Sequence, residues 1–203
     1  MARLVEDVVG EACVAVLEGD RELAVRVIKR DADVDSEEVH VEGEVIRLLA
    51  LYQPVGSDLR MLCTILKVNN DLERIADGAV NLAERAKYLD RQAAQKRQAI
   101  LTQLVASVRD ILSMAVRAYA TEDARLAGEV QKRDDPIDSL YEKFLREMAA
   151  EGPDASCGMA AQIDLFSVAK NLERIADHAT NIAEDVIFLV EGKDVRHHHM
   201  EPA

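Results

Sequence analysis

The stretch DLERIADGAVNLAE, residues 71–84, returns almost unchanged as NLERIADHATNIAE at residues 171–184, one hundred positions later. Ten of the fourteen aligned letters are identical, which chance does not produce. A second pair of segments, VIKRDADVDS at 27–36 and VQKRDDPIDS at 130–139, repeats with an offset of 103. The chain therefore contains an internal duplication: its two halves derive from one ancestral unit that was copied.

Apolar residues recur at three- and four-residue spacing along nearly the whole chain, which is typical of α-helices, and no strand-like alternation competes with it. Breaks that contain Gly, Pro or a capping Asp, Ser or Thr divide this pattern into six expected helices. They cover about residues 3–18, 20–52, 57–89, 92–120, 122–149 and 155–191. The predicted fold is all-α.

The repeat groups these helices into two tandem three-helix bundles. We expect the first bundle at residues 1–90, the second at 91–193 and a polar tail at 194–203. A three-helix unit with a broad apolar stripe on each helix can close its own core. The tail contains His197, His198 and His199, and three histidines at a terminus do not by themselves indicate a metal site.

Composition narrows the classes of function. The formal net charge of −13 and the lack of a basic block argue against nucleic acid as a general partner. Cys13, Cys63 and Cys157 form no CxxC pair, so we expect reduced thiols. Glu6 and Asp7 interrupt what would be a signal peptide, and no run of eighteen apolar residues occurs, so we expect no membrane span and a cytoplasmic protein.

The repeated stretch carries a line of acidic and amide side chains in each half. Side chains four residues apart lie about 40° from each other on a helix, so they share one face, opposite the apolar one. The first-half stripe is Glu73, Asp77, Asn81 and Glu84, and the second-half stripe is Glu173, Asp177, Asn181 and Glu184.

Like charges four residues apart repel, and an ordinary exposed face mixes signs. From the residue spacing we expect no Lys or Arg on the same line as either stripe, and a bound cation would remove the repulsion. A solvated polar face without any ion is the alternative.

The preceding helix of each half supplies another pair of acids, Asp31 with Asp35 and Asp134 with Asp138. If the second and third helices of a half pack antiparallel, the pair and the stripe converge into an oxygen-rich site. Oxygen ligands suit Mg²⁺, Ca²⁺, Mn²⁺ or iron and match structural Zn²⁺ poorly. The sequence therefore predicts a candidate metal site in each half.

Arg74 and Arg174 follow the first Glu of each stripe, near the edge of the apolar face. A guanidinium there is able to bind a carboxylate or another helix in a bidentate manner. We expect either a partner contact or an ion pair within the protein.

Positive signs of catalysis are missing from the sequence. The repeated stretches lack the Glu-x-x-His pattern of di-iron bundles, and no Ser–His–Asp or Cys–His grouping or glycine-rich phosphate loop is found. We expect a protein that is not an enzyme, although a carboxylate-bridged metalloenzyme or a metal-storage bundle is the rival from another class.

The motifs LERIAD…NLAE and LERIAD…NIAEDVIFLVEGKDVRH, with VIKRDADVD and YQPVGSDLR, closely resemble the duplicated signature of the PhoU family of phosphate-signalling regulators. The resemblance covers essentially the whole chain. It implies a cytoplasmic, all-helical, often dimeric protein that negatively regulates the phosphate-starvation response. It also implies two partners, the ATPase subunit of the phosphate ABC transporter and a membrane sensor histidine kinase.

Some members of that family bind iron or zinc clusters through E/D-x-x-x-D motifs, which correspond here to Asp31–Asp35, Glu73–Asp77, Asp134–Asp138 and Glu173–Asp177. Two departures from the family matter. The first helix is short, which puts partner contacts on that surface in doubt. Pro136 lies inside one acidic pair, where proline kinks or restarts a helix, so the two sites are expected to be unequal.

Overall fold

The computed structural model describes residues 1–151 and 158–195, and this part of the chain is built of α-helices without strands. The all-α prediction is confirmed there. The helices are α1 (Ala2–Glu18), α2 (Arg21–Lys29), α3 (Asp31–Tyr52), α4 (Ser57–Ala86), α5 (Arg91–Lys96), α6 (Gln98–Thr121), α7 (Ala124–Gln131), α8 (Asp134–Glu151) and α9 (Met159–Glu191).

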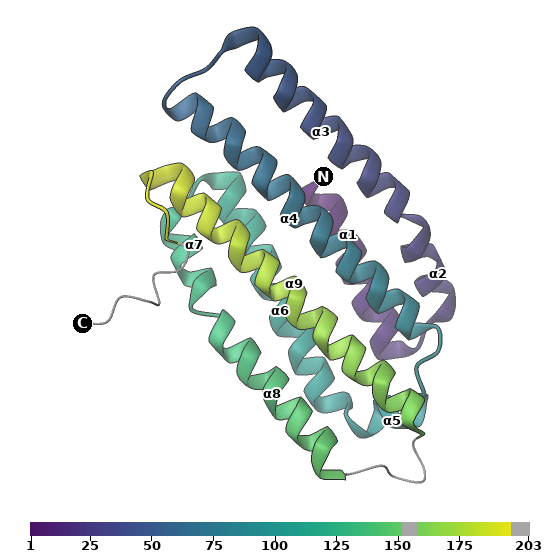
Figure 1. The fold of residues 1–203 in the computed structure, drawn as a ribbon. Coiled ribbons are helices and arrows are strands. Elements are labelled where there is room, and N and C mark those ends of the chain that lie inside the picture. Colours follow the sequence, from purple (N-terminus) through teal and green to yellow (C-terminus); the bar gives the residue numbers. More distant parts are fainter. Residues whose placement is uncertain (152–157, 196–203) are drawn as a thin grey trace, which may run out of the picture.

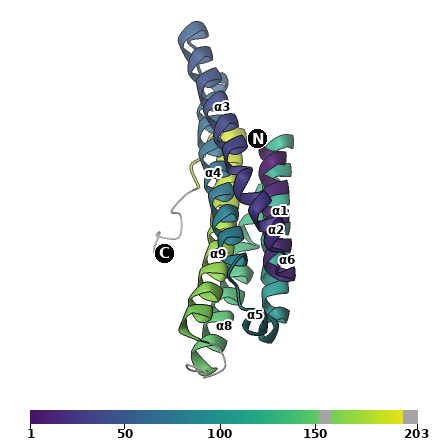
Figure 2. The same ribbon diagram turned by 90° about the vertical axis from the view of Figure 1, so that its right-hand side faces the viewer.

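The helices form two layers. Figure 1 shows α3, α4, α9 and α8 side by side, and Figure 2, turned by 90°, shows α1 and α6 as a second layer. Helix α1 packs on α4, and α6 packs on α9 in the same way, while the two halves meet through α4 with α9 and α1 with α6. The repeat in the sequence thus becomes a repeat in space.

The two units share one core. The buried apolar side chains form a single cluster that draws on both halves, and the broadest packing joins α4 to α9. At this contact, which we call the α4–α9 seam, Gly78 lies so close to α9 that an added Cβ would be 2.9 Å from Cγ1 of Ile175. The absence of a side chain at position 78 therefore allows the two repeated helices to approach each other. The domain limits at residues 90 and 193 remain predictions.

The capping residues expected from the sequence begin three helices. Asp20 accepts a hydrogen bond from the backbone N–H of Leu23, Asp90 from that of Ala93, and Asp123 from that of Leu126, each at 2.9 Å. An Asp at the N-cap satisfies one of the unpaired N–H groups of the first helical turn. The boundaries that rest on this chemistry were predictable.

Three expected helices are each divided in two, which is a correction to the predicted six. The second helix of each half breaks at equivalent places, Arg30 and Lys132–Arg133, and the fourth breaks at Arg97. Pro136 lies in the first turn of α8, where an N–H has no intrahelical partner. The helix does restart just before this proline. The first half breaks without one, since Asp33 occupies the equivalent position, so proline is not the only cause.

Helix α6 is long and apolar enough to cross a membrane by length and composition, but half of its most apolar window is buried inside the protein, as in the core helix of a globular bundle. Cys13 is buried and Cys63 partly buried, and both are free thiols. Cys157 and the three histidines at 197–199 lie outside the described residues.

Candidate metal site

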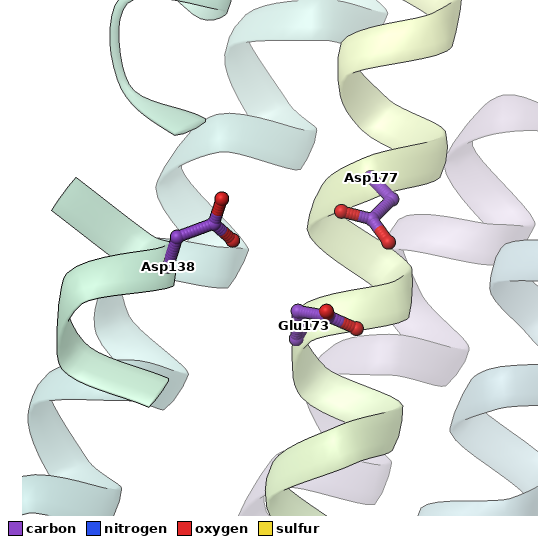
Figure 3. A group of neighbouring side chains, drawn as sticks. All are labelled: Asp138, Glu173 and Asp177. Atoms are coloured by element: carbon purple, nitrogen blue, oxygen red, sulfur yellow. The ribbon is translucent and has the colours of Figure 1, made fainter. Parts of the chain in front are cut away.

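In the second half, the predicted convergence of acids is present between α8 and α9. Oxygens of Asp138, Glu173 and Asp177 lie within 4.8 Å of one another, and we call this group the three-carboxylate cluster. Figure 3 shows Asp138 directing its carboxylate from α8 toward α9, from which Glu173 and Asp177 project one turn apart. The antiparallel packing of consecutive helices brings residues about 35 positions apart together, as the sequence predicted.

Burial raises the pKa values of Asp138 and Asp177, and repulsion between the negative charges of the three-carboxylate cluster and of the neighbouring Asp134 raises them further. Burial, followed by the charges of Glu173, Asp134 and Asp138, raises the pKa of Asp177 from its ordinary 3.8 to about 6. Burial and then Asp134 raise the pKa of Asp138. Burial also raises the pKa of Asp134. A hydrogen bond that the Thr180 hydroxyl donates to Asp134 at 3.2 Å lowers this pKa in part. Carboxylates that are partly buried and close to one another are stabilised by a nearby positive charge, such as a bound cation or a basic side chain.

One lysine supplies part of that charge. Nζ of Lys170 lies 2.7 and 2.6 Å from the two carboxylate oxygens of Glu173, one turn along α9. The same Nζ lies 5.5 Å from the centre of the Tyr141 ring on α8. The sequence-based statement that no Lys or Arg shares the line of the stripe is therefore wrong for this half.

In the first half, the acids also converge, and there too a cation from their own helix lies among them. Nε of Arg74 is 3.3 Å from Glu73, and Nη1 is 3.6 Å from Asp77. Burial and then Asp77 raise the pKa of Glu73, while Arg74 lowers it. Burial followed by the charge of Asp35 raises the pKa of Asp31. Within the described ranges, only the second half brings three carboxylates within 4.8 Å.

The two arginines singled out in the sequence differ in their surroundings. Arg74 forms the ion pair that was one of its two expected roles. Arg174 is exposed, and its contact with a partner stays a prediction.

The remaining stripe residues lie toward solvent. Asn81 and Glu84 are exposed, and Glu184 is half-buried. Asn181 instead donates a hydrogen bond at 3.3 Å to Asp71 across the α4–α9 seam. Its role as a ligand remains a prediction, and the structure gives it a competing structural role.

Sequence reasoning missed the polar contacts of the seam. Nδ1 of His178 lies 2.8 Å from Oδ1 of Asp71, and Lys67 forms an ion pair with Asp185 at 2.9 Å. The two residues of each pair are more than one hundred positions apart, so no local spacing in the sequence predicts these contacts. Lys170 could have been found, since it stands three residues before Glu173 and such pairs meet on a helix.

Comparison with known proteins agrees with the internal repeat. A family model described as the PhoU domain matches the chain twice, over residues 1–86 and 101–186. The two matches correspond to the two halves that the repeat defines.

Named relatives extend over nearly the whole chain. The phosphate-specific transport system accessory protein PhoU homologue of Aquifex aeolicus is 38% identical over 201 residues, which cover 99% of this chain and 91% of the relative. The homologue of Pseudomonas putida is 37% identical over 198 residues, covering 97% of this chain and 77% of the relative.

Solved structures agree in fold. The crystal structure of PhoU from Pseudomonas aeruginosa superposes with a TM-score of 0.88 at 34% identity, covering 95% of this chain and 93% of that one. The phosphate transport system regulatory protein PhoU from Streptococcus pneumoniae gives a TM-score of 0.88 at 27% identity, covering 96% and 91%.

Proposed function

Because this chain belongs to the PhoU family, we propose that it is an accessory regulator of phosphate transport that represses the phosphate-starvation response. The relatives' names, which describe accessory proteins of the phosphate-specific transport system, support the transport link. In this proposal the protein works in the cytoplasm, as a homodimer, between the ATPase subunit of the transporter and a sensor histidine kinase.

The observation that carries the chemical part of the proposal is the three-carboxylate cluster. Its donors are oxygens only, close enough for one ion and crowded by like charge, which fits a hard or borderline divalent cation. Asp138, Glu173 and Asp177 would hold iron or zinc, with manganese and magnesium as further candidates. A bound cation would supply the positive charge that ties α8 to α9.

The proposed role is regulation by binding, without a catalytic step. The histidine within the repeated motif, His178, lies 2.8 Å from Asp71 in the seam between the halves and does not complete a di-iron ligand set. The rival, a carboxylate-bridged metalloenzyme or a metal-storage bundle, would oxidise iron or accumulate it in the purified protein. An assay of Fe²⁺ oxidation on the full chain separates the two.

The test of the regulatory role replaces the cluster in cells. The variant Asp138→Asn/Glu173→Gln/Asp177→Asn removes the ligands with little change in shape. We expect it to derepress a phosphate-starvation reporter in phosphate-rich medium, and elemental mass spectrometry of the purified protein to show loss of its metal.

A matched control removes the same number of charges from exposed positions outside the cluster, on α2, α7 and α8. It is Glu22→Gln/Glu129→Gln/Glu147→Gln, whose residues are exposed, and it should keep both repression and metal. Normal repression in a folded cluster variant would remove the cluster from the mechanism, and equal metal content in the two variants would remove it as a metal site.

A further inference from the structure

The two halves supply their internal cation from different positions. Lys170 reaches Glu173 from one turn earlier on α9, but the equivalent position in α4, one hundred residues earlier, is Asn70. The first half relies on Arg74, which follows Glu73 directly. The duplicated helices therefore diverged at the residue that faces the three-carboxylate cluster.

The ammonium group of Lys170 occupies the carboxylate that a metal would use. Its nitrogen lies within 2.7 Å of both oxygens of Glu173, and the Glu173 side chain is only 14% exposed. A divalent cation bound to Glu173 and Asp177 would lie a few ångströms from this positive charge, and the two would repel each other. Lys170 and a metal therefore compete for one ligand.

The structure also gives Lys170 a second partner. The ring of Tyr141 lies 5.5 Å from Nζ, on α8 and three residues after Asp138, and an aromatic face attracts an ammonium group. A lysine side chain is long and flexible enough to leave Glu173 while keeping this contact. The displaced charge would then bridge α9 to α8 beside the cluster.

We propose that Lys170 is a tethered competitor for metal in the second half: it neutralises Glu173 when no ion is bound and swings toward Tyr141 when a divalent cation enters. It thereby sets the metal affinity of this half separately from that of the first. The inference rests on the proposed metal role of the cluster.

The test is Mn²⁺ binding by the full chain, stripped of metal with a chelator and measured by isothermal titration calorimetry. Lys170→Asn installs the residue of the first half. We expect about tenfold tighter binding, which corresponds to about 1.4 kcal/mol and is the scale of close charge interactions at a partly solvated surface.

Two controls make the result specific. Lys143→Asn removes the same charge by the same substitution from α8, where Lys143 is exposed and pairs with Glu147 at 4.0 Å, and should leave Mn²⁺ affinity within about twofold, because exposed charges at a distance are screened. Adding Lys170→Asn to the variant Asp138→Asn/Glu173→Gln/Asp177→Asn should change nothing, because the competed ligand is already gone.

The outcomes separate the two levels of the argument. Unchanged or weaker binding in Lys170→Asn, confirmed with Lys170→Gln, overturns the competition, as does an equal gain in Lys143→Asn. Equal Mn²⁺ binding by the parent and the triple carboxylate variant overturns the cluster as a metal site, and the competition with it. Circular dichroism of each variant verifies that it is folded.

Discussion

Replacing Asp177 by Asn should stabilise the metal-free protein at neutral pH. Burial and the neighbouring acids raise the pKa of this carboxyl from 3.8 to about 6, so the folded chain holds its proton more tightly than the unfolded chain. Between about pH 4 and 6 the folded state binds more protons, and the free energy of unfolding therefore falls as pH rises through that window. Above pH 6 the whole destabilisation is present.

The size of the effect follows from the pKa and from exposure. A pKa rise from 3.8 to about 6 corresponds at most to about 3 kcal/mol, at 1.36 kcal/mol for each tenfold change in proton affinity. Asp177 is only partly shielded and keeps much of its surface open to solvent, so screening reduces this to about 1 kcal/mol. For a chain of this length, about 1 kcal/mol changes Tm by roughly 2–4 °C.

The assay is thermal unfolding followed by circular dichroism, in chelator, at steps from pH 4 to 7.5. Relative to the parent, Asp177→Asn should gain about 1 kcal/mol at pH 7.5, and the gain should shrink toward zero as pH falls to 4. The matched control is Asp77→Asn at the equivalent position. Asp77 lies 3.6 Å from Arg74, so its loss should be neutral or should destabilise by a few tenths of a kcal/mol.

A variant Asp177→Asn that is less stable than the parent at pH 7.5 would refute the reasoning. So would a gain of equal size at every pH, because titration of the carboxyl could not then be its source. A gain in Asp77→Asn as large as in Asp177→Asn would show that net charge alone, and not the cluster, is responsible.

Further predictions concern packing, helix caps and ligand binding. Gly78→Ala should destabilise by about 1–3 kcal/mol in urea unfolding, because the new Cβ would meet the fully buried Ile175 at 2.9 Å; a stabilised variant would show that α4 and α9 can move apart at no cost. Asp123→Ala should lose about 1 kcal/mol, since its carboxylate accepts the N–H of Leu126, and no loss would mean that water replaces the cap. Mn²⁺ at one hundred times its Kd should stabilise the parent protein against unfolding by about 2.7 kcal/mol. A Tm that does not change when Mn²⁺ is added would contradict binding to the folded state.

The parts of the fold that depend on local chemistry were predictable from the sequence. The all-α class followed from apolar spacing, and Asp20, Asp90 and Asp123 marked helix starts because a capping carboxylate acts within three residues. The break at Arg30 was missed, since neither Gly nor Pro accompanies it and the helix resumes at Asp31.

Some contacts of the candidate site were likewise predictable from the sequence, and others were not. The meeting of Asp138 with Glu173 and Asp177 followed from antiparallel packing of consecutive helices. The contact between Asp71 and His178 required knowledge of how the two halves pack, which no spacing within either half contains. The position of Lys170 was readable in the sequence, but its choice of Glu173 over solvent was not.

The α4–α9 seam bears on how such a chain can evolve. The pair Asp71 with His178 has its equivalent one hundred residues away in Asn171 and Gly78, where a Cβ added to Gly78 would lie 3.8 Å from the backbone oxygen of Asn171. In a homodimer every substitution appears twice, once in each subunit. Two repeats within one polypeptide are free of that constraint. Asp71 and His178 form a hydrogen-bonded side-chain pair, whereas the equivalent Asn171 and Gly78 form a close contact, so a single gene encodes an asymmetry that a symmetric pair of identical subunits does not have.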